Sequence, residues 1–322
     1  MHTTGTQGTK PEILAIGPFP DCTLTELNER FRVHHFSKLP THDDIPLIVA
    51  TRIRAVATVT IYGIPRTLLD RLPNVEVVCV FGVGADAVDL IATRERAIPV
   101  TNTPDIVAPE VADLAIGMML ASARNIVHGD HYARSGDWGK KGPIALGRSV
   151  GNKICGIVGL GAIGTAIATR ATALRMKVLY TSRSEKRKVN YEFVASLPEL
   201  ARRSDFLMVA CTGGPDTQNL ISREIIQALG PTGTLINVSR GSVVDEEALI
   251  ECLSNKSLGY AALDVYANEP HFDNRLRNFQ NVILQPHHAT AVLEARIAMG
   301  QLVVDNLVAH FGNAPLLTPI RR

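Results

Sequence analysis

Short clusters of hydrophobic residues alternate along this chain with amphipathic stretches, a pattern typical of parallel α/β folds. In the first hundred residues, the apolar runs predict strands, and the stretches between them carry helical periodicity. Strands are predicted for residues 12–17, 45–51, 55–61, 75–80 and 99–101, and helices for 24–31, 67–72 and about 86–96. Residues 1 to about 102 therefore resemble one small α/β domain, preceded by a loose Thr/Gly-rich tail over residues 1–10.

The pattern changes after residue 103. Residues 107–127 are apolar nearly all round, which predicts one long helix buried between domains or subunits. Residues 129–148 are polar and glycine-rich, contain Trp138 and are expected to form a loop or arm. Further strands are predicted for residues 154–158, 177–181, 205–211, 234–238, 259–265 and 281–284, followed by an amphipathic helix over 293–311.

The most informative stretch is the glycine turn that follows the apolar run 154–158. Gly159, Gly161 and Gly164 have the G-x-G-x-x-G spacing, and a run of small and apolar residues typical of a helix follows. The first N–H groups of such a helix have no partner within it, and they suit a pyrophosphate. This spacing also occurs in ordinary turns, but the strand before it and the helix after it favour a dinucleotide site. The residues expected at that site are Gly159, Leu160, Gly161, Ala162 and Ile163.

The next strand end indicates which dinucleotide is preferred. An acidic residue about 20 positions after the glycines would hold a free ribose 2′-hydroxyl. Ser182, Arg183 and Ser184 stand there instead, followed by further basic residues. Since arginine offers forked donors to a phosphate dianion, this set favours NADPH, with NADH as a weaker possibility. The alternative is an ordinary solvated polar loop.

Three later strand ends carry side chains that suit hydride transfer to a keto acid. Arg240 could hold a carboxylate, His287 could supply a proton, and Glu269 could orient that histidine. Taken singly, each has an ordinary structural explanation, such as a surface ion pair or a loop carboxylate. Because ligands bind outside the carboxyl ends of parallel strands, their occurrence at three exits of one sheet favours a catalytic site.

Composition excludes several other classes of protein. The 322 residues contain 33 Lys plus Arg and 31 Asp plus Glu, a net charge of +2 that argues against nucleic-acid or membrane-surface binding. The five cysteines are widely spaced without a C-x-x-C pair, so neither a metal site nor a disulfide framework is expected. A reducing cytoplasm is the simplest setting. No apolar run approaches the ~18 residues of a membrane span.

Ordered motifs from about residue 45 onward resemble those of the D-isomer-specific 2-hydroxyacid dehydrogenases. The segments that carry the resemblance are 81–86, 100–104, the glycine turn, 237–241, 263–265, 269–270 and 286–287. Within that family, residues 181–184 and 285–289 are most similar to NADPH-dependent glyoxylate/hydroxypyruvate reductases and hydroxyphenylpyruvate reductases.

The resemblance implies a role for each matching residue. It implies that Arg240 binds substrate, that His287 is the acid/base and that Glu269 is its partner. The motif places its histidine directly after Pro286, which indicates His287 as the acid/base and not the adjacent His288. Further implied contacts are the backbone N–H groups of Val83 and Gly84 to the substrate carboxylate, Asp264 and Val238 to the nicotinamide carboxamide, and Cys211, Thr212 and Thr217 to the adenine and ribose side.

The resemblance also implies the architecture. Two doubly wound parallel-sheet domains are expected, with a Rossmann cofactor domain (103–290) inserted in a flavodoxin-like substrate domain (1–102 plus 291–322), and a cleft that closes over substrate. A homodimer built on the long helix and the Trp138 arm is expected. Trp138 would either close the neighbouring subunit's site or simply anchor the interface.

These observations predict an NADPH-dependent reductase that converts small 2-keto acids into D-2-hydroxy acids. Glyoxylate, hydroxypyruvate, phenylpyruvates and 2-ketogluconate all remain open as substrates. One alternative is a corepressor-like protein that senses NAD(P) without catalysis, which the full set of Arg240, Glu269 and His287 argues against. The other is a different dehydrogenase of the family, such as one for phosphoglycerate or formate; Glu269 argues against formate, where related enzymes carry an amide.

Overall fold

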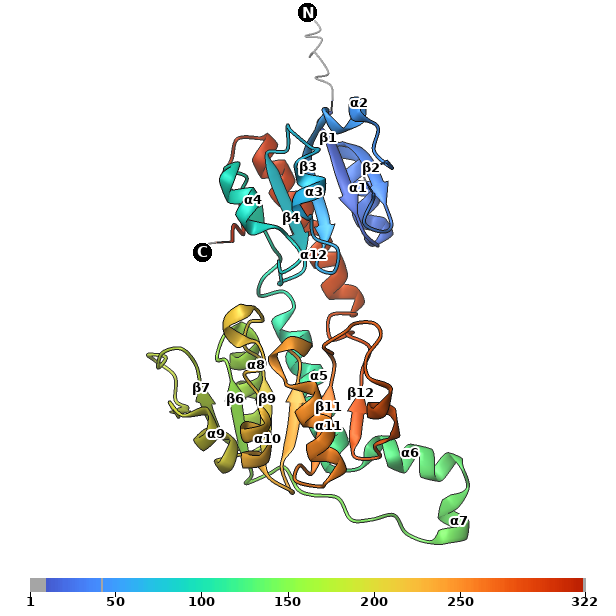
Figure 1. Ribbon diagram of the computed structural model, residues 1–322, viewed down its shortest axis with the longest axis vertical. Coiled ribbons are helices and arrows are strands. Elements are labelled where there is room, and N and C mark those ends of the chain that lie inside the picture. Colours follow the sequence, from blue (N-terminus) through green and yellow to red (C-terminus); the bar gives the residue numbers. More distant parts are fainter. Residues whose placement is uncertain (1–9, 42, 321–322) are drawn as a thin grey trace, which may run out of the picture. The chain divides into compact units, whose positions relative to one another are not determined.

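The computed structural model describes residues 10–41 and 43–320, which form two compact units (Figure 1). One unit extends to Val107 and resumes at Ala291, and the other spans Ala108–Thr290. The sequence predicts the first domain boundary between residues 102 and 103, but the first unit extends to Val107. Thr103 belongs to the first unit, since its N–H donates to the Gly82 carbonyl at 2.9 Å. The tail expected over residues 1–10 lies outside the described residues, apart from Lys10.

The first unit is built on a five-stranded sheet in which every strand pair is parallel. Its order is β2-β1-β3-β4-β5, the flavodoxin-like arrangement. The strands are β1 (Glu12–Ile16), β2 (Arg32–Phe36), β3 (Ile53–Val59), β4 (Val77–Phe81) and β5 (Val100–Thr101). The helices are α1 (Asp21–Arg30), α2 (Leu47–Ala50), α3 (Arg66–Leu69), α4 (Leu90–Glu95) and α12 (Leu293–Phe311).

Burial on both faces explains the near-continuous apolar runs of the central strands, because helices cover a parallel sheet on both sides. All five residues of β4 are buried. Helix α12, at the far end of the chain, packs against β4 and α1, and the rings of Phe31 and Phe311 lie 5.6 Å apart. The expected final helix over 293–311 is confirmed.

In this unit one sequence prediction was wrong, and one strand was not predicted. Residues 45–51, expected as a strand, contain the short helix α2, which follows Pro46 and leaves Leu47 and Ile48 exposed. An apolar run alone did not distinguish a short helix from a strand. Strand β2 was not predicted, since Arg32 and two histidines make this edge strand polar.

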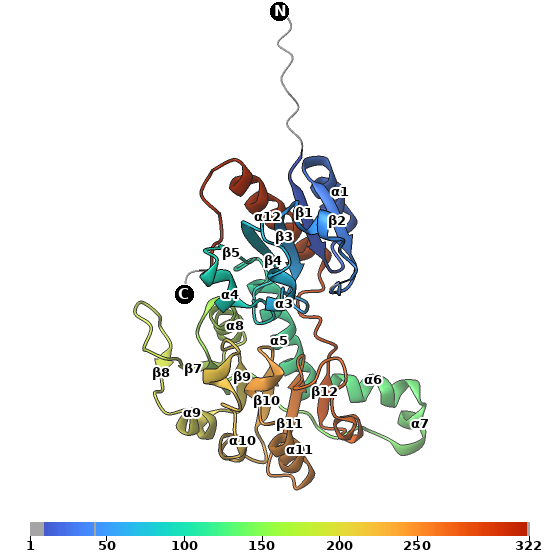
Figure 2. The ribbon, with the colours of Figure 1, turned by 45° about the horizontal axis from the view of Figure 1, so that its top comes forward.

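The second unit is built on a seven-stranded parallel sheet of order β12-β11-β10-β9-β6-β7-β8, of which Figure 2 labels β7 to β12. The strands are β6 (Ile154–Val158), β7 (Lys177–Thr181), β8 (Glu192–Phe193), β9 (Phe206–Val209), β10 (Thr234–Asn237), β11 (Tyr260–Leu263) and β12 (Val282–Leu284). The α-helices are α5 (Ala108–Ala123), α6 (Ile126–Arg134), α7 (Asp137–Lys141), α8 (Ala162–Ala173), α9 (Leu197–Arg203), α10 (Arg223–Leu229) and α11 (Glu246–Ser254). Three 3₁₀ turns complete it: η1 (Pro215–Thr217), η2 (Gly241–Val243) and η3 (Asn274–Asn278).

This order is that of the Rossmann fold with one additional strand, so the predicted fold class of both units is confirmed. The chain reverses its direction of travel across the sheet between the adjacent strands β6 and β9. Such a switch point opens a crevice at the carboxyl ends of the strands, where ligands bind. The glycine turn follows β6 at this position.

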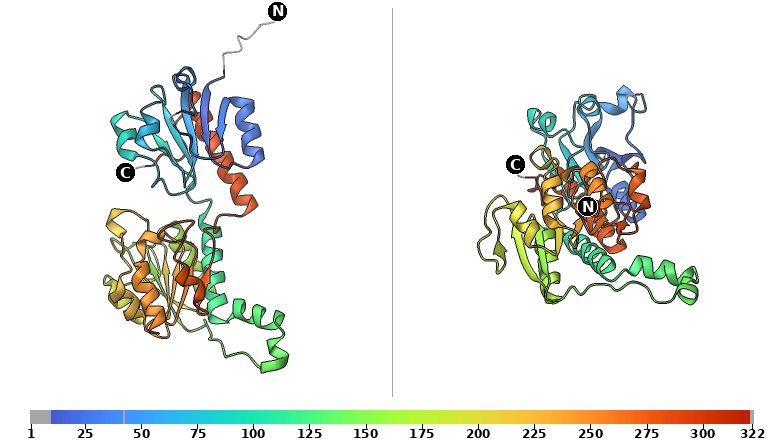
Figure 3. Two further views of the ribbon diagram at one scale, coloured as in Figure 1. Left: turned by 45° about the vertical axis from the view of Figure 1, so that its right-hand side comes forward. Right: turned by 60° about the horizontal axis from the view of Figure 1, so that its bottom comes forward.

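The long helix predicted for residues 107–127 is interrupted. Helix α5 ends at Ala123, and Asn125 adopts a left-handed conformation (φ 54°) before α6 begins. The arm expected as a loop over 129–148 is therefore partly helical, with α6 and α7 projecting away from the seven-stranded sheet in both views of Figure 3. Helical propensity did not reveal these elements because glycines interrupt them.

The C-terminal segment is bound to the first unit through buried Asn306. Its side-chain oxygen accepts hydrogen bonds from the N–H groups of Leu317 (3.0 Å) and Thr318 (3.3 Å). Its amide nitrogen donates to the Thr318 hydroxyl at 3.0 Å, and Thr101 forms an antiparallel bridge with Pro319. The buried Asn306 amide therefore fixes this segment to α12, while the bridge to Thr101 keeps it along the edge of β5.

We expect Asn306→Leu to lower the free energy of unfolding by about 2–4 kcal/mol, because it leaves the N–H groups of Leu317 and Thr318 without their acceptor. Urea unfolding followed by circular dichroism measures this change. Limited proteolysis should cleave the C-terminal segment faster in the variant. Gln301→Ala, an exposed change on the same helix, is the control and should shift stability by less than about 0.5 kcal/mol.

Candidate active site

The glycine turn joins β6 to α8 at the switch point of the seven-stranded sheet. Gly159 has φ +94°, and a Cβ there would lie 2.6 Å from the Cα of Cys211 at the exit of β9. A Cβ at Gly164 would lie 2.0 Å from the Gly159 carbonyl oxygen. Two of the three glycines are thus required by backbone approaches within the protein itself.

Gly161 differs, because a Cβ built on it would meet no atom within 4 Å. It is the N-cap of α8, and no side chain of the described residues caps the first turn of that helix. The open N–H groups and the positive end of the helix dipole suit a diphosphate. The turn from Gly159 to Ile163 therefore fits the dinucleotide that the sequence predicts.

The segment after β7 lies next to this turn, since the Gly159 N–H donates to the Thr181 carbonyl at 2.9 Å. The Ser182 hydroxyl donates to the Ser184 carbonyl at 2.6 Å, and Arg183 is exposed. Among the described residues, no carboxylate pairs with the Arg183 guanidinium. The three predicted phosphate ligands are therefore adjacent, and the Arg183 side chain is open to a ligand.

The loop after β9 brings together the residues predicted for the adenine and ribose side. The Thr217 hydroxyl donates to the Thr212 carbonyl at 2.8 Å, which folds the loop on itself. The Ser239 hydroxyl donates to the Cys211 carbonyl at 2.5 Å and ties this loop to the exit of β10, directly after Val238. Asn237 and Ser239 were missed in the sequence, although polar residues at a buried strand end are a signal.

The central contact of the site joins two strand exits. Nδ1 of His287 lies 2.5 Å from Oε2 of Glu269, and the other carboxylate oxygen accepts the Tyr266 N–H at 2.9 Å. The structure thus pairs Glu269 with His287 and not with His288. Tyr266, which the sequence analysis missed, also donates its hydroxyl to the Gln285 carbonyl at 2.8 Å, so it connects the exits of β11 and β12.

Electrostatics favour the ionised carboxylate in this pair. Burial alone would raise the pKa of Glu269, but hydrogen bonds from His287 and the Tyr266 N–H, with the charges of His287 and Arg240, hold its pKa below the ordinary value. Because this pKa is lower in the folded than in the unfolded protein, the ionised Glu269 stabilises the fold at any pH above the ordinary carboxylate pKa. This stabilisation is lost as the pH falls through the lowered pKa. Glu269 is therefore a charged partner for the imidazole throughout the neutral range.

Arg240 follows β10 in a tightly packed setting. A Cβ at Gly213 would lie 2.5 Å from Cγ of Arg240, and a Cβ at Gly241 would lie 1.8 Å from the Tyr266 carbonyl. The Asn237 amide donates to the Arg240 carbonyl at 3.0 Å. Gly213 therefore leaves room for the Arg240 side chain beside the loop after β9, and Gly241 lets the backbone after Arg240 approach the loop that carries Glu269.

Asp264 holds the backbone that carries the histidine. Its two carboxylate oxygens accept the N–H groups of His288 at 2.9 Å and Ala289 at 3.2 Å. His287 itself has φ 51°, a left-handed conformation that few residues other than glycine adopt. Burial raises the pKa of Asp264, while these hydrogen bonds and the charges of the two histidines counteract that increase. Whether Asp264 also contacts a nicotinamide carboxamide stays a prediction.

Val83 and Gly84 lie in the first unit, after β4. The loop is fixed by Thr103, whose hydroxyl accepts the Gly82 N–H at 3.1 Å, and by Asn102, which donates to the Val83 carbonyl at 2.7 Å. Among the described residues, neither the Val83 N–H nor the Gly84 N–H makes a hydrogen bond. Two adjacent backbone donors are therefore available to an anion.

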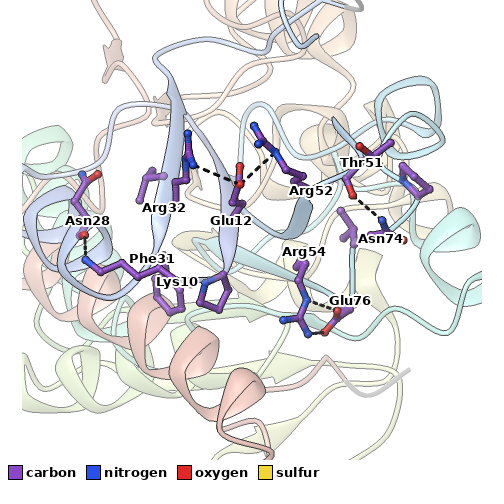
Figure 4. A pocket seen from close by; sticks show the side chains of 14 residues that line it. Lys10, Glu12, Asn28, Phe31, Arg32, Thr51, Arg52, Arg54, Asn74 and Glu76 are labelled. Atoms are coloured by element: carbon purple, nitrogen blue, oxygen red, sulfur yellow. Dashed lines mark hydrogen bonds and ion pairs between the residues drawn. The ribbon is translucent and has the colours of Figure 1, made fainter. Parts of the chain in front are cut away.

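A large hollow in the first unit does not belong to this chemistry. It has a volume of about 1240 Å³ and lies at the amino ends of the strands, opposite to the edge where parallel sheets bind ligands. Ion pairs line it: Arg52 lies 3.2 Å from Glu12, and Arg54 lies 2.6 Å from Glu76 (Figure 4). We interpret it as a surface hollow lined by structural ion pairs.

Residues 10–41 and 43–320 contain no group of three or more His, Cys, Asp or Glu placed to hold a metal ion. None of their helices combines the length and apolar character needed to cross a membrane.

Comparison with known proteins identifies the family. Residues 116–289 match the model of the D-isomer specific 2-hydroxyacid dehydrogenase NAD-binding domain. Hydroxyphenylpyruvate reductase of Plectranthus scutellarioides is 44% identical, with 95% of this chain and 99% of that protein covered. Glyoxylate/hydroxypyruvate reductase A (HPR2) of Arabidopsis thaliana is 42% identical, over 96% and 98% of the two chains.

A solved structure is similar over almost the whole chain. It is the NADPH-dependent glyoxylate/hydroxypyruvate reductase of Sinorhizobium meliloti in complex with NADP and malonate, which is 37% identical. The match has a TM-score of 0.90 and covers 98% of this chain and 99% of that one. With this fold, this glycine turn and these relatives, the chain is an oxidoreductase and belongs to the family of D-isomer specific 2-hydroxyacid dehydrogenases.

Proposed function

We propose that this protein is an NADPH-dependent reductase that converts small 2-keto acids into D-2-hydroxy acids. The observation that carries the proposal is the 2.5 Å contact between Glu269 and His287, with the charge of Arg240 acting on the same carboxylate. These three groups lie at the carboxyl edge of a sheet whose glycine turn fits a dinucleotide. The names of the relatives support the substrate class, since they reduce hydroxyphenylpyruvate, glyoxylate or hydroxypyruvate.

Each residue of the site has a separate role in the proposed reduction. When bound, the nicotinamide supplies a hydride to the keto carbon. Arg240 binds the substrate carboxylate and carbonyl, and the backbone N–H groups of Val83 and Gly84 bind the carboxylate. His287 keeps Nδ1 on Glu269, so Nε2 carries the proton that passes to the carbonyl oxygen. Glu269 orients the imidazole through its hydrogen bond to Nδ1.

The cofactor would be held by groups already in place. The pyrophosphate would lie on the turn from Gly159 to Ile163, and Ser182, Arg183 and Ser184 would bind the 2′-phosphate of NADPH. A binding protein that senses NAD(P) without catalysis would require none of the Arg240, Glu269 and His287 geometry. That geometry favours an enzyme.

We further propose a cytoplasmic homodimer. All five cysteines are free, and Cys79, Cys155 and Cys252 are buried as reduced thiols, which suits a reducing compartment. The arm formed by α6, α7 and the segment after them exposes Ile126, Val127, Trp138 and Leu146. Leu146 is 97% exposed and Trp138 68% exposed, and an apolar group of this kind marks an interaction surface.

The reaction is tested by the fall in absorbance at 340 nm when the protein, NADPH and a 2-keto acid are mixed. Glyoxylate, hydroxypyruvate, phenylpyruvate and 2-ketogluconate form the panel, and each is repeated with NADH. His287→Gln and Arg240→Ala should each lower kcat/KM by at least about 100-fold, because they remove the proton donor and the carboxylate ligand.

His288→Gln is the matched control for these variants, since its ring is not paired with Glu269. We expect it to change kcat/KM by less than about threefold. Near-normal turnover in His287→Gln would exclude the role given to that side chain. Absence of turnover with every keto acid would favour the binding protein.

Glu269→Gln should lower kcat/KM about 10- to 100-fold at neutral pH, because a neutral amide orients the imidazole less firmly than a carboxylate does. The pKa of Glu269 is held below its ordinary value, so the unaltered protein should keep this carboxylate ionised until the pH falls through the carboxylate range. A pH profile of kcat/KM with both proteins measures both effects. Equal kcat/KM in the two proteins at neutral pH would contradict the assigned partnership.

Leu146→Asp should convert the dimer into monomers, because it places a charge on the exposed apolar arm. Sedimentation velocity at several protein concentrations gives the mass of each species. Ile91→Asp, an exposed change on α4 of the first unit, should leave the dimer intact. A monomeric unaltered protein would exclude the proposed assembly.

A further inference from the structure

The proposed use of NADPH depends on the segment that joins β7 to β8. Residues 182–191 carry Ser182, Arg183 and Ser184, and the parallel strands on either side end at Thr181 and begin at Glu192. No helix is present in this connection, so its backbone is not ordered by regular structure. A site for one phosphate group nevertheless needs its ligands in fixed positions.

Tyr180 provides an anchor inside the sheet. Its side chain is fully buried, and its ring lies 5.4 Å from that of Phe193 on the neighbouring strand β8. Its phenol oxygen accepts the backbone N–H of Lys186 at 2.8 Å. A buried phenol usually has a hydrogen-bond partner, and here that partner is the middle of the basic segment.

Arg183 lies between two fixed points as a result. On one side, Thr181 belongs to β7 and accepts the Gly159 N–H of the glycine turn at 2.9 Å. On the other side, Lys186 is bound to the Tyr180 hydroxyl. The bond from the Ser182 hydroxyl to the Ser184 carbonyl shortens the turn between these points. The backbone at Arg183 therefore belongs to a closed loop that begins beside the cofactor turn.

We infer that Tyr180 is a positioning residue for cofactor selection. Its phenol oxygen holds the segment in the form that presents Ser182, Arg183 and Ser184 to the 2′-phosphate. NADH has no phosphate at this position, so its binding does not depend on the order of the segment. This inference rests on the proposed use of NADPH, and Tyr180 itself is not expected to touch the cofactor.

Tyr180→Phe removes the acceptor and keeps the buried ring. We expect the ratio of kcat/KM with NADPH to kcat/KM with NADH to fall about three- to tenfold, the effect of one hydrogen bond. The change should appear in KM for NADPH, while kcat and the constants with NADH stay within about twofold. Tyr191→Phe, in the same segment, is the matched control and should leave the ratio unchanged.

Two binding measurements separate positioning from general stability. The unaltered protein should bind 2′,5′-ADP more tightly than 5′-AMP, and Tyr180→Phe should weaken only the first ligand. Hydrogen exchange should show faster exchange of the Lys186 amide in the variant. An unchanged cofactor ratio in Tyr180→Phe overturns the inference, whatever the exchange rate.

A second pair of variants covers the case in which Tyr180→Phe does not fold. Lys186→Pro removes the N–H donor together with the charge, and Lys186→Ala removes the charge alone. The proline variant should lower the ratio further than the alanine variant, and equal effects would overturn the inference.

Arg183→Ala distinguishes this inference from the proposed function. If it leaves the cofactor ratio unchanged, the proposed 2′-phosphate site itself fails. If it lowers the ratio and Tyr180→Phe does not, the phosphate site stands and only the role of Tyr180 is excluded.

Discussion

The contact between the Glu269 carboxylate and the His287 imidazole is the interaction on which the site depends. A carboxylate bound to one ring nitrogen fixes the orientation of the other, and the proposed proton transfer needs such a fixed direction. Neighbouring residues fix both partners of this contact. The Tyr266 N–H binds the carboxylate, and Asp264 binds the backbone that carries the histidine. Gly241 lets the loop after β10 approach the loop after β11, which carries Glu269.

The parallel sheet explains how residues so distant in sequence come to one place. Strands β6, β7, β9, β10, β11 and β12 all end at the same edge, so each loop that leaves this edge contributes a separate part. The loops after β6 and β7 carry the features that fit a dinucleotide. The loops after β10, β11 and β12 carry the groups that suit proton transfer. Hydrogen bonds between the loops, such as that from Ser239 to Cys211, hold these parts in register.

Much of this arrangement could be predicted from the sequence because its signals are local. The glycine spacing and the side chains at strand exits are visible in single short segments. The polar edge strand β2 and the short helix α2 were not predictable, since tertiary contacts outweigh weak local preferences there. Tyr266, Asn306 and Tyr180 were missed for a different reason. Each acts through a backbone group elsewhere in the chain, and no residue pattern records such a partner.

The C-terminal segment also affects how readily the protein can aggregate at high concentration. Strand β5 is the outermost strand of its sheet, and an uncovered strand of this kind can pair with another chain. The bridge between Thr101 and Pro319, with the bond from the Ile320 N–H to the Val100 carbonyl, occupies that border. The segment therefore blocks pairing of β5 with a strand of another molecule. A chain that lost the segment would tend to aggregate through addition of a strand at β5.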